Sequence, residues 1–498
     1  MTAERGGSLL VVDVGTSGVR AGIVRPDATV DHVHHVHVLP DSPAPGLVEV
    51  DPRRVAEAAL SVASAALAAG GPVVGVGIAN QRATTVVWDR SSGEPVAPGI
   101  GWQDLRTVGT CLALQADGIR LMPNASATKL AAILDDVDPE RRRAADELCF
   151  GTIDSWVGWT LSGGASGSAL HVTDATNAGV TALVTSEVAW DDAVLDVLGI
   201  PRSMLPRIVD SSGEVGEASA LAGAPPICGI VGDQQASLIG QGCTRPGLAK
   251  ATFGTGGMLD LCTGARPSAR GEVRGPAGTF PIVAWQRGGS TTWGVEAIML
   301  SAGSCVEWLR DDLGILASAD ESAGVAARAD QAADVWFVPA LLGMGTPVWD
   351  FGARGTVVGI TRGTGRPELV RAVLEGVAHR GADLLEAAEA DSGLSVGTLR
   401  VDGGMSANVV FMAALAEAIG RRVEVSAELE ATTLGAGFLA GLAVGTWADE
   451  DDVAAAYRPR ASWEPTGDEG VRAARRSRWL EARDRSARTI PELSGIAF

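Results

Sequence analysis

The chain has 498 residues, 46% of them hydrophobic and 20% charged, which is the composition of a soluble globular protein with a large core. This length predicts two or three domains rather than one. Acidic residues outnumber basic ones by 60 to 40, and the net charge of −20 argues against nucleic acid and anionic membranes as partners.

The cysteines and the N-terminus indicate a cytoplasmic protein. Six cysteines are scattered along the chain without any C-x-x-C pair, which is typical of reduced, buried thiols. The N-terminus is polar and the apolar run that follows stops at Asp13, so we expect no signal peptide. The only two lysines, Lys129 and Lys250, lie outside any G-x-x-x-x-G-K-[ST] pattern, which excludes a P-loop.

The first half of the chain alternates expected strands and helices. Apolar runs predict strands and helical spacing predicts helices. In chain order these are strands at 9–14 and 19–24, a helix at 52–69, strands at 73–78 and 84–88, a mostly helical segment at 112–149, and a strand at 227–231.

The pattern restarts after Cys243 with a strand at 250–253, which predicts a boundary between domains at 1–245 and 246–498. The second half repeats a glycine turn, strands and then helices. We expect the helices at 300–312, 367–391 and 409–419, with a charged, amphipathic surface helix near 468–489.

Asp13-Val14-Gly15-Thr16-Ser17 directly follows the first apolar run. A strand that ends in Asp-x-Gly-Thr and turns back into a second strand forms a tight hairpin. Its N–H groups and hydroxyls can then face a phosphate chain, and glycine allows the close approach. Arg20 on the returning strand adds a cation. The alternative is an ordinary hairpin with a glycine turn.

A second glycine-threonine turn, Phe253-Gly254-Thr255-Gly256-Gly257, lies 20 residues after Asp233 in Gly232-Asp233-Gln234-Gln235. An aspartate after a buried strand often caps a helix. In the functional interpretation Asp233 accepts a hydroxyl proton during phosphoryl transfer, a reaction that needs mainly alignment and charge neutralisation. Two phosphate cradles around one carboxylate predict a kinase.

Two further patterns have structural alternatives. The glycines of Asp402-Gly403-Gly404, followed by Asn408, allow close approach of a ligand, or simply form a strand-to-helix turn. Four histidines between 32 and 37 alternate with valines, and a solvated edge strand explains them better than a metal site.

The chain resembles the FGGY carbohydrate kinase family, and within it the glycerol kinase branch. The segment 355–360, followed after seven residues by 368–375, fits the family's second signature at each constrained position. The likeness extends from about Leu9 to about Trp447. Supporting stretches are 80–82, 101–104, 151–154, 173–177, 339–350, 400–404 and 433–437.

The resemblance implies an α/β, two-domain, actin-like ATPase (ribonuclease H-like) fold with the active site in the cleft between the domains. It implies ATP and Mg²⁺, and transfer of the γ-phosphoryl group to a terminal hydroxyl of a small polyol. Relatives are often homodimers or homotetramers, so either state is expected.

The motif match also implies roles for single residues. Asp233 is the catalytic base, and Asp13 helps to hold magnesium through water. The nucleotide residues are Thr16, Ser17 and Arg20 along the phosphates, Thr255 and Gly303 at the nucleotide, and Gly404 and Asn408 on the adenosine side. The acceptor residues are Arg82, Ala83, Trp102, Asn124, Asp233 and Gln234.

The acceptor pocket departs from the glycerol kinase pattern at two positions. Ala83 stands where glycerol kinases typically have a glutamate that accepts hydrogen bonds from substrate hydroxyls, and Asn124 stands where a tyrosine is expected. Loss of an acceptor around which a site was built costs much of kcat/KM. The acceptor is therefore expected to be glycerol or a related tetritol or pentitol. A xylulose-like ketose kinase and a non-catalytic actin-like ATPase are the alternatives.

Overall fold

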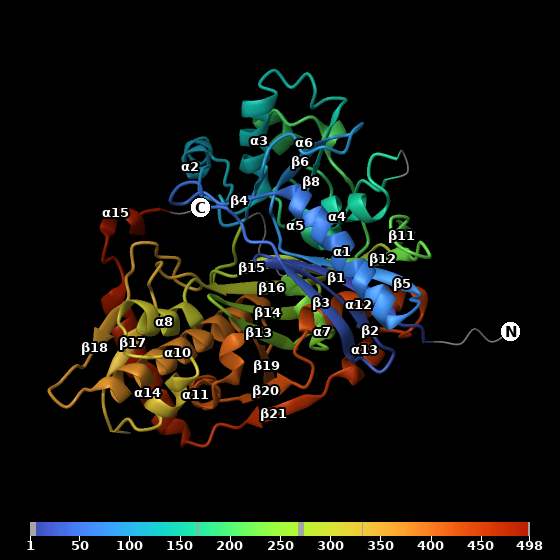
Figure 1. Cartoon of the computed structure of the whole chain (residues 1–498). Coiled ribbons are helices and arrows are strands. Elements are labelled where there is room, and N and C mark those ends of the chain that lie inside the picture. Colours follow the sequence, from blue (N-terminus) through green and yellow to red (C-terminus); the bar gives the residue numbers. More distant parts are fainter. Residues whose placement is uncertain (1–5, 167–168, 267–272, 331, 497–498) are drawn as a thin grey trace.

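The computed structural model describes residues 6–166, 169–266, 273–330 and 332–496 (Figure 1). Residues 1–5 and 497–498, at the outer ends of the two predicted domains, lie outside this range. One sheet of 13 strands runs through both halves of the chain. Its order is β21 (Pro459–Trp463), β20 (Arg422–Ser426), β19 (Thr398–Asp402), β13 (Ala249–Phe253), β14 (Gly257–Gly264), β16 (Ser290–Met299), β15 (Phe280–Arg287), β11 (Ser212–Glu217), β12 (Pro226–Gly232), β5 (Gly75–Asn80), β1 (Leu9–Gly15), β2 (Gly18–Val24) and β3 (Val30–His37).

Helices pack on this sheet and in a smaller unit beside it, and the strands outside the sheet form two-stranded pairs (Figure 1). The helices are α1 (Pro52–Gly70), α2 (Val108–Ala116), α3 (Ser126–Val137), α4 (Ile153–Leu161), α5 (Ala175–Gly179), α6 (Asp192–Leu198), α7 (Asp233–Gly240), α8 (Gly303–Glu307), α9 (Glu321–Ala326), α10 (Arg366–Ser392), α11 (Val409–Ile419), α12 (Ala431–Val444), α13 (Glu450–Ala456), α14 (Glu469–Ser486) and α15 (Pro491–Ser494). The remaining strands pair two by two: β4 (Glu49–Val50) with β7 (Gly99–Ile100), β6 (Val86–Asp89) with β8 (Leu148–Gly151), β9 (Val172–Asp174) with β10 (Arg207–Val209), and β17 (Trp336–Val338) with β18 (Thr356–Val358).

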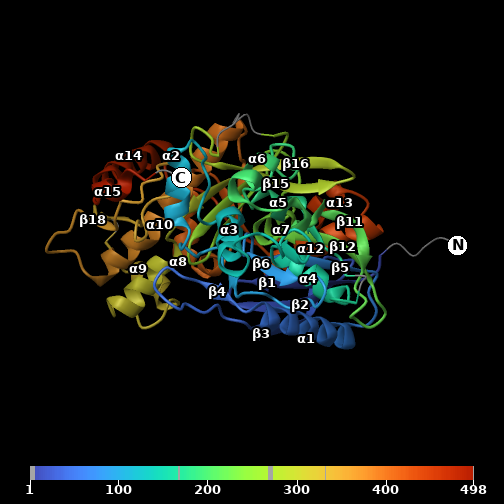
Figure 2. The ribbon, with the colours of Figure 1, turned by 90° about the horizontal axis from the view of Figure 1, so that it is seen from above.

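The two halves of the sheet meet at β11 and β15, where Ser212 lies opposite Arg287. In the first half, α1 packs along β1, β2 and β3 (Figure 2). In the second half, α10 and α11 bury the apolar faces of β13, β14 and β16. The predicted boundary at 245/246 falls between α7 and β13, and its position remains a prediction.

A small unit stands above the sheet in Figure 1, built from α2, α3, α6, β6 and β8. Its own apolar core holds residues such as Leu130, Leu134, Leu148 and Phe150. Trp102 lies in the loop between β7 and α2, and Asn124 lies in the loop between α2 and α3, so this unit carries two of the predicted acceptor residues.

Several predicted elements are confirmed. β1 and β2 form the expected antiparallel hairpin, α1 begins at Pro52, and α11 spans 409–419 as predicted. The histidines lie on β3, at the edge of the sheet, and three of the four are exposed. Among the described residues, no cluster of three or more histidine, cysteine, aspartate or glutamate side chains could hold a metal ion.

Two helix predictions were partly wrong. The segment 300–312 begins its helix only at Gly303, because the Gly303 N–H is bonded to the Gly254 carbonyl, and a π-helical turn follows from Trp308. The segment 112–149 contains α2 and α3, but Leu148 already belongs to β8. No helix in the described ranges is long and apolar enough to cross a bilayer.

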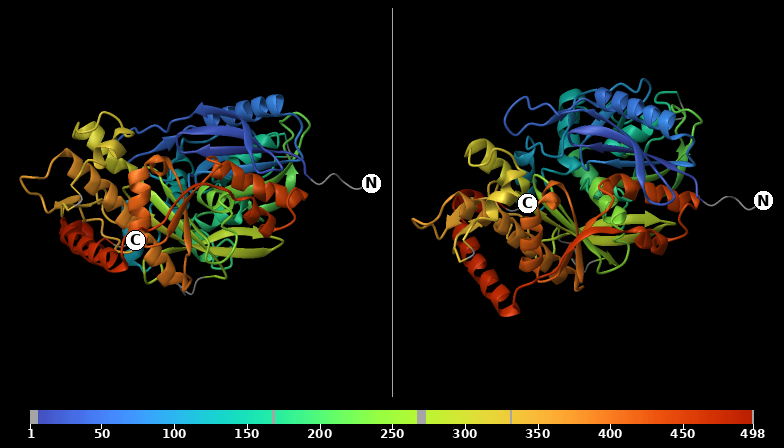
Figure 3. Two further views of the ribbon diagram at one scale, coloured as in Figure 1. Left: turned by 90° about the horizontal axis from the view of Figure 1, so that it is seen from below. Right: turned by 60° about the horizontal axis from the view of Figure 1, so that its bottom comes forward.

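Helix α12 belongs to the second half by sequence but packs on strands of the first half. It contacts β12, β5 and β1 and crosses α7 (Figure 3). The two helices approach so closely that a Cβ at Gly435 would overlap the Ala236 carbonyl, and one at Gly240 would overlap the Ala431 carbonyl. Glycine is therefore required on both sides of the crossing.

We expect Gly435→Ala to lower the free energy of unfolding by about 3 kcal/mol, because neither helix backbone can yield without moving the strands beneath it. Urea denaturation followed by circular dichroism measures the change. Gly324→Ala is the matched control, since Gly324 is an exposed helical glycine with no atoms within 4 Å of its Cβ position. That control should gain up to about 1 kcal/mol. Equal effects of the two changes would contradict the close crossing.

Candidate active site

The first glycine-threonine turn connects the ends of β1 and β2. Gly15 pairs with Gly18, so Thr16 and Ser17 form the tip. The Thr16 Oγ1 accepts a hydrogen bond from Trp102 Nε1 at 3.2 Å. The predicted phosphate cradle therefore touches a residue of the predicted acceptor side.

Behind this tip, Asp13 and Arg20 lie opposite each other on the hairpin. Arg20 Nε is 3.6 Å from Asp13 Oδ2, and Arg20 Nη1 forms an ion pair with Glu430, the residue that precedes α12. Burial raises the pKa of Asp13 to about 7; Arg20 opposes this rise, while Asp233 and Glu430 add to it. Asp13 thus lies in a buried cluster where acids exceed cations.

Asp233 begins α7 directly after β12 and does not cap the helix, because Gly232 occupies the capping position. Its Oδ1 accepts a hydrogen bond from the Gln234 N–H at 2.8 Å and lies 3.6 Å from Arg82 Nε. Burial raises the pKa of Asp233, and Arg82 opposes the rise. The side chain still exposes 29% of its surface, as a base that meets a substrate requires.

The acceptor side is held together by hydrogen bonds between loops. Asn124 Nδ2 donates to the Trp102 carbonyl at 3.0 Å, and the Trp102 N–H donates to Thr84 Oγ1 at 3.3 Å. Lys129 Nζ donates to the carbonyls of Gly101, at 2.7 Å, and Asn124, at 3.2 Å. The fully buried Lys129 amine therefore holds both loops together. Its burial lowers the pKa of Lys129 to about 7.

Ala83 and Gln234 complete the predicted acceptor set. Ala83 is buried and has a φ of 61°, and its carbonyl accepts hydrogen bonds from Thr85 Oγ1 and Ser126 Oγ. Such a left-handed conformation is uncommon for a residue other than glycine and fixes the direction of the Cβ. Gln234 Oε1 accepts a hydrogen bond from Lys250 Nζ at 2.6 Å.

Three of the predicted nucleotide residues lie at or near the second glycine-threonine turn: Thr255, Gly303 and Gly404. The Thr255 carbonyl accepts hydrogen bonds from the N–H groups of Ala302 and Ser304, next to Gly303. Gly404 follows Gly403, where a Cβ would lie 2.5 Å from the Phe253 carbonyl oxygen. No atoms lie within 4 Å of the Cβ position at Gly404, so its surroundings are open.

Asn408 has a clear structural role. Its Oδ1 accepts the N–H groups of Val410 and Phe411 as the cap of α11, and its Nδ2 donates to Ser322 Oγ at 2.9 Å. The strand-to-helix turn that we considered as the alternative is therefore present. A contact between Asn408 and adenosine remains a prediction.

Three buried charged residues next to the site were not predicted from the sequence: Glu296, Asp260 and Lys250. Glu296 Oε2 is 2.7 Å from Arg82 Nη2, and Lys250 Nζ is 2.8 Å from Asp260 Oδ2. A charged residue inside an apolar strand, as in Leu259-Asp260-Leu261 and Val295-Glu296-Ala297, was the available signal.

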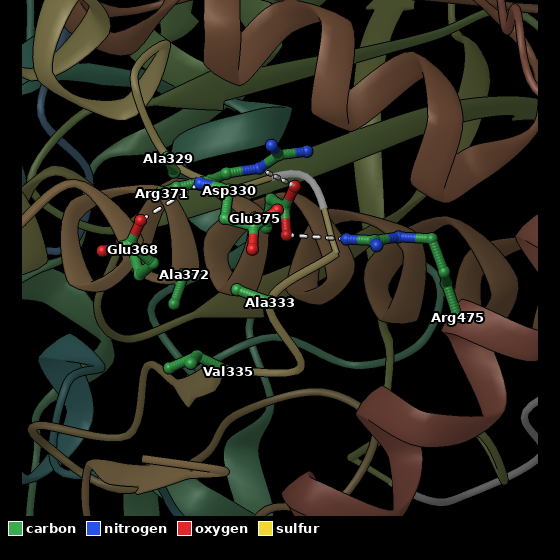
Figure 4. Close-up of a pocket in the computed structure, with 9 residues that line it drawn as sticks. All are labelled: Ala329, Asp330, Ala333, Val335, Glu368, Arg371, Ala372, Glu375 and Arg475. Carbon is green, nitrogen blue, oxygen red and sulfur yellow. Dashed lines mark hydrogen bonds and ion pairs between the residues drawn. The ribbon is translucent and has the colours of Figure 1, made fainter. Parts of the chain in front are cut away.

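The second family signature lies away from this site. Its two glutamates lie on α10. Glu368, in the first turn, accepts the Gly365 N–H. Glu375, further along the helix, pairs with Arg371 and Arg475 (Figure 4). A shallow depression there is lined by Ala329, Asp330, Ala333, Val335, Glu368, Arg371, Ala372, Glu375 and Arg475. None of the predicted catalytic or binding residues lines this depression.

The two halves of the chain match the two domain models of one protein family. Residues 8–240 match the N-terminal domain, and residues 249–444 the C-terminal domain, of the FGGY family of carbohydrate kinases. The chain belongs to the FGGY family.

Similar proteins include glycerol kinases from Dechloromonas aromatica and Deinococcus radiodurans. The first is 42% identical, over 96% of this chain and 97% of its own length; the second is 40% identical, over 95% and 96%. The crystal structure of Plasmodium falciparum glycerol kinase with ADP superposes with a TM-score of 0.87 at 27% identity, covering 96% of this chain and 98% of that one. The xylulose kinase of Rhodospirillum rubrum shares the fold, with a TM-score of 0.81 at 22% identity over 95% and 98% of the two chains.

Lys129 gives this FGGY kinase a specific dependence of stability on pH. Between its folded pKa of about 7 and its ordinary value of 10.5, the unfolded chain binds a proton that the folded chain has lost. The Lys129 contribution to the free energy of unfolding therefore rises with pH across this window, by up to about 1.4 kcal/mol per unit.

Urea denaturation at pH 7, 8 and 9 tests this by comparing the wild type with Lys129→Met. The difference between the two free energies of unfolding should grow with pH in favour of the wild type. A difference that is the same at all three pH values would contradict a neutral, buried Lys129.

Proposed function

We propose that this FGGY kinase transfers the γ-phosphoryl group of ATP to a terminal hydroxyl of a small polyol, either glycerol or a related tetritol or pentitol. The observation that carries the proposal is the position of Asp233. It is half-buried at the start of α7, with Arg82 Nε at 3.6 Å, and its charge acts on Asp13 of the phosphate hairpin. A base thus lies between a phosphate cradle and an acceptor side.

In this proposal Asp233 accepts the proton of the acceptor hydroxyl as its oxygen attacks the γ-phosphorus and ADP leaves. Arg82 and Gln234 orient the acceptor from either side of Asp233, and Trp102 forms a wall of the pocket. Thr16, Ser17 and Arg20 bind the phosphates from the first turn. Thr255, Gly303, Gly404 and Asn408 bind the nucleotide from the second half.

The residues at the hairpin also fit Mg²⁺. Asp13 is buried, with Asp233 and Glu430 acting on it electrostatically, and Arg20 is the cation that pairs with both Asp13 and Glu430. Mg²⁺ is usually held by one or two carboxylates, substrate phosphates and waters rather than by a full protein cage. Asp13 would hold the ion through water, and the ion would neutralise charge on the phosphates.

The acceptor class rests on the named glycerol kinase relatives and on Ala83 and Asn124. Ala83 offers no carboxylate to a substrate hydroxyl, and the Nδ2 of Asn124 is already bonded to the Trp102 carbonyl. The acceptor side therefore lacks the carboxylate that the glycerol kinase pattern implies, and a smaller side chain stands at position 83, which favours a polyol longer than glycerol. The cytoplasmic location and the homodimer or homotetramer remain predictions.

The proposed activity is tested by coupled ADP release with Mg-ATP against a panel of polyols and ketoses. One polyol should stimulate ADP release, and Asp233→Asn should lower kcat by about 10²- to 10⁴-fold, because the proton loses its acceptor. Nucleotide binding by the variant, measured by calorimetry, should be retained. Basal ATP hydrolysis alone would favour the non-catalytic class, and a leading ketose would favour the xylulose-like alternative.

The acceptor preference is tested by Ala83→Glu, which restores a carboxylate at a backbone position that is equally strained for both residues. The ratio of kcat/KM for glycerol to that for a tetritol should rise by about tenfold or more, since a matched hydroxyl gains its acceptor. Ala83→Gln has a similar volume without the charge and should change the ratio less. An unchanged ratio in both variants would show that Ala83 does not face the acceptor.

A further inference from the structure

A row of charged side chains crosses the second half of the sheet beside the site. Lys250 on β13, Asp260 on β14 and Glu296 on β16 lie directly opposite one another in register. All three are buried, and Lys250 and Asp260 expose none of their surface. Two acids opposite each other on neighbouring strands repel, so this row requires cations at both of its ends.

Lys250 and Arg82 are these cations, and they connect the row to the residues around Asp233. At one end, Lys250 Nζ pairs with Asp260 and donates to Gln234 Oε1. At the other end, Glu296 Oε2 lies 2.7 Å from Arg82 Nη2. Arg82 follows β5 in the first half of the chain, so the ion pair also joins the two halves.

Arg82 faces two carboxylates and lies closer to one of them. Its Nη2 is 2.7 Å from Glu296, whereas its Nε is 3.6 Å from Asp233 Oδ1. A guanidinium can bind a carboxylate through two parallel N–H donors. If Arg82 bound Asp233 in that way, the carboxylate would be a weaker base and less accessible to a hydroxyl.

We propose that Glu296 is a positioning residue that holds Arg82 away from Asp233, so that the Asp233 carboxylate stays free to accept the proton of the acceptor hydroxyl. The proposal rests on the role of Asp233 in the proposed function. The charged groups that face Asp233 are Arg82, Lys250, Asp260 and Asp13, and none of them is altered in the test below.

The test is Glu296→Gln, which keeps the shape of the side chain and removes its charge. We measure kcat and KM for the best acceptor of the panel, KM for ATP, and the pH profile of kcat. Arg82 should turn toward Asp233, so the acid limb of the profile should move to lower pH by about one unit and kcat at pH 8 should fall by about tenfold. KM for ATP should change less than twofold.

Glu375→Gln is the matched control. It removes the same charge from the ion pairs with Arg371 and Arg475 on α10, outside the candidate site. Its pH profile should be that of the wild type even if its melting temperature falls. A Glu296→Gln variant that loses stability but keeps the wild-type profile would show that Glu296 is only structural and would overturn the proposal.

Glu296→Asp decides the question if Glu296→Gln does not fold. The shorter carboxylate lets Arg82 approach Asp233, so the shift should have the same direction and a smaller size, whereas an unchanged profile and kcat would overturn the proposal. Asp233→Asn distinguishes a failure of the proposed function from a failure of the positioning role of Glu296. If it stays active, the base assignment fails and this proposal with it; if it is inactive while both Glu296 variants keep the wild-type profile, only the positioning role fails.

Discussion

The close crossing of α12 over α7 is the constraint on which the site depends. Gly435 and Gly240 let the two helix backbones touch, and Gly77 and Gly229 let α12 lie flat against β5 and β12. Asp233 stands at the start of α7, and Glu430, which holds Arg20, stands just before α12. The contact between these helices of different halves, together with the paired strands β12, β5 and β1, therefore fixes Asp233 relative to the β1–β2 hairpin.

The second physical feature of this site is its excess of acidic over basic side chains. Five carboxylates (Asp13, Asp233, Asp260, Glu296 and Glu430) lie among three cations (Arg20, Arg82 and Lys250), and half of these eight residues are buried. Burial raises the pKa of Asp13 and Asp260, to about 7 and about 6. In the proposed function, a divalent ion that arrives with the nucleotide would offset this excess of acid.

Patterns of neighbouring residues predicted the elements of the fold well. They could not predict contacts between residues that lie far apart in the chain. The Asp-x-Gly-Thr turn gave the β1–β2 hairpin because its geometry is set by neighbouring residues. The Glu296–Arg82 ion pair joins strands whose order in the sheet cannot be read from one sequence. The charged, amphipathic tail helix is confirmed as α14, which is mostly exposed and buries Trp479 on its inner side against the β17–β18 hairpin. Motif matching pointed to the proposed base, phosphate hairpin and acceptor loops, but not to the buried charges of Lys250, Asp260 and Glu296.

The burial of both lysines has a consequence for the chemistry of the surface. All other basic side chains except the six histidines are arginines, so the native protein offers amine-acylating reagents no exposed lysine. Lys129 becomes reactive only when the loops that carry Trp102 and Asn124 separate, and Lys250 only when the sheet interior opens. The acylation rates of these two amines therefore report two distinct opening motions. A ligand that closes the acceptor loops would slow the first and leave the second nearly unchanged.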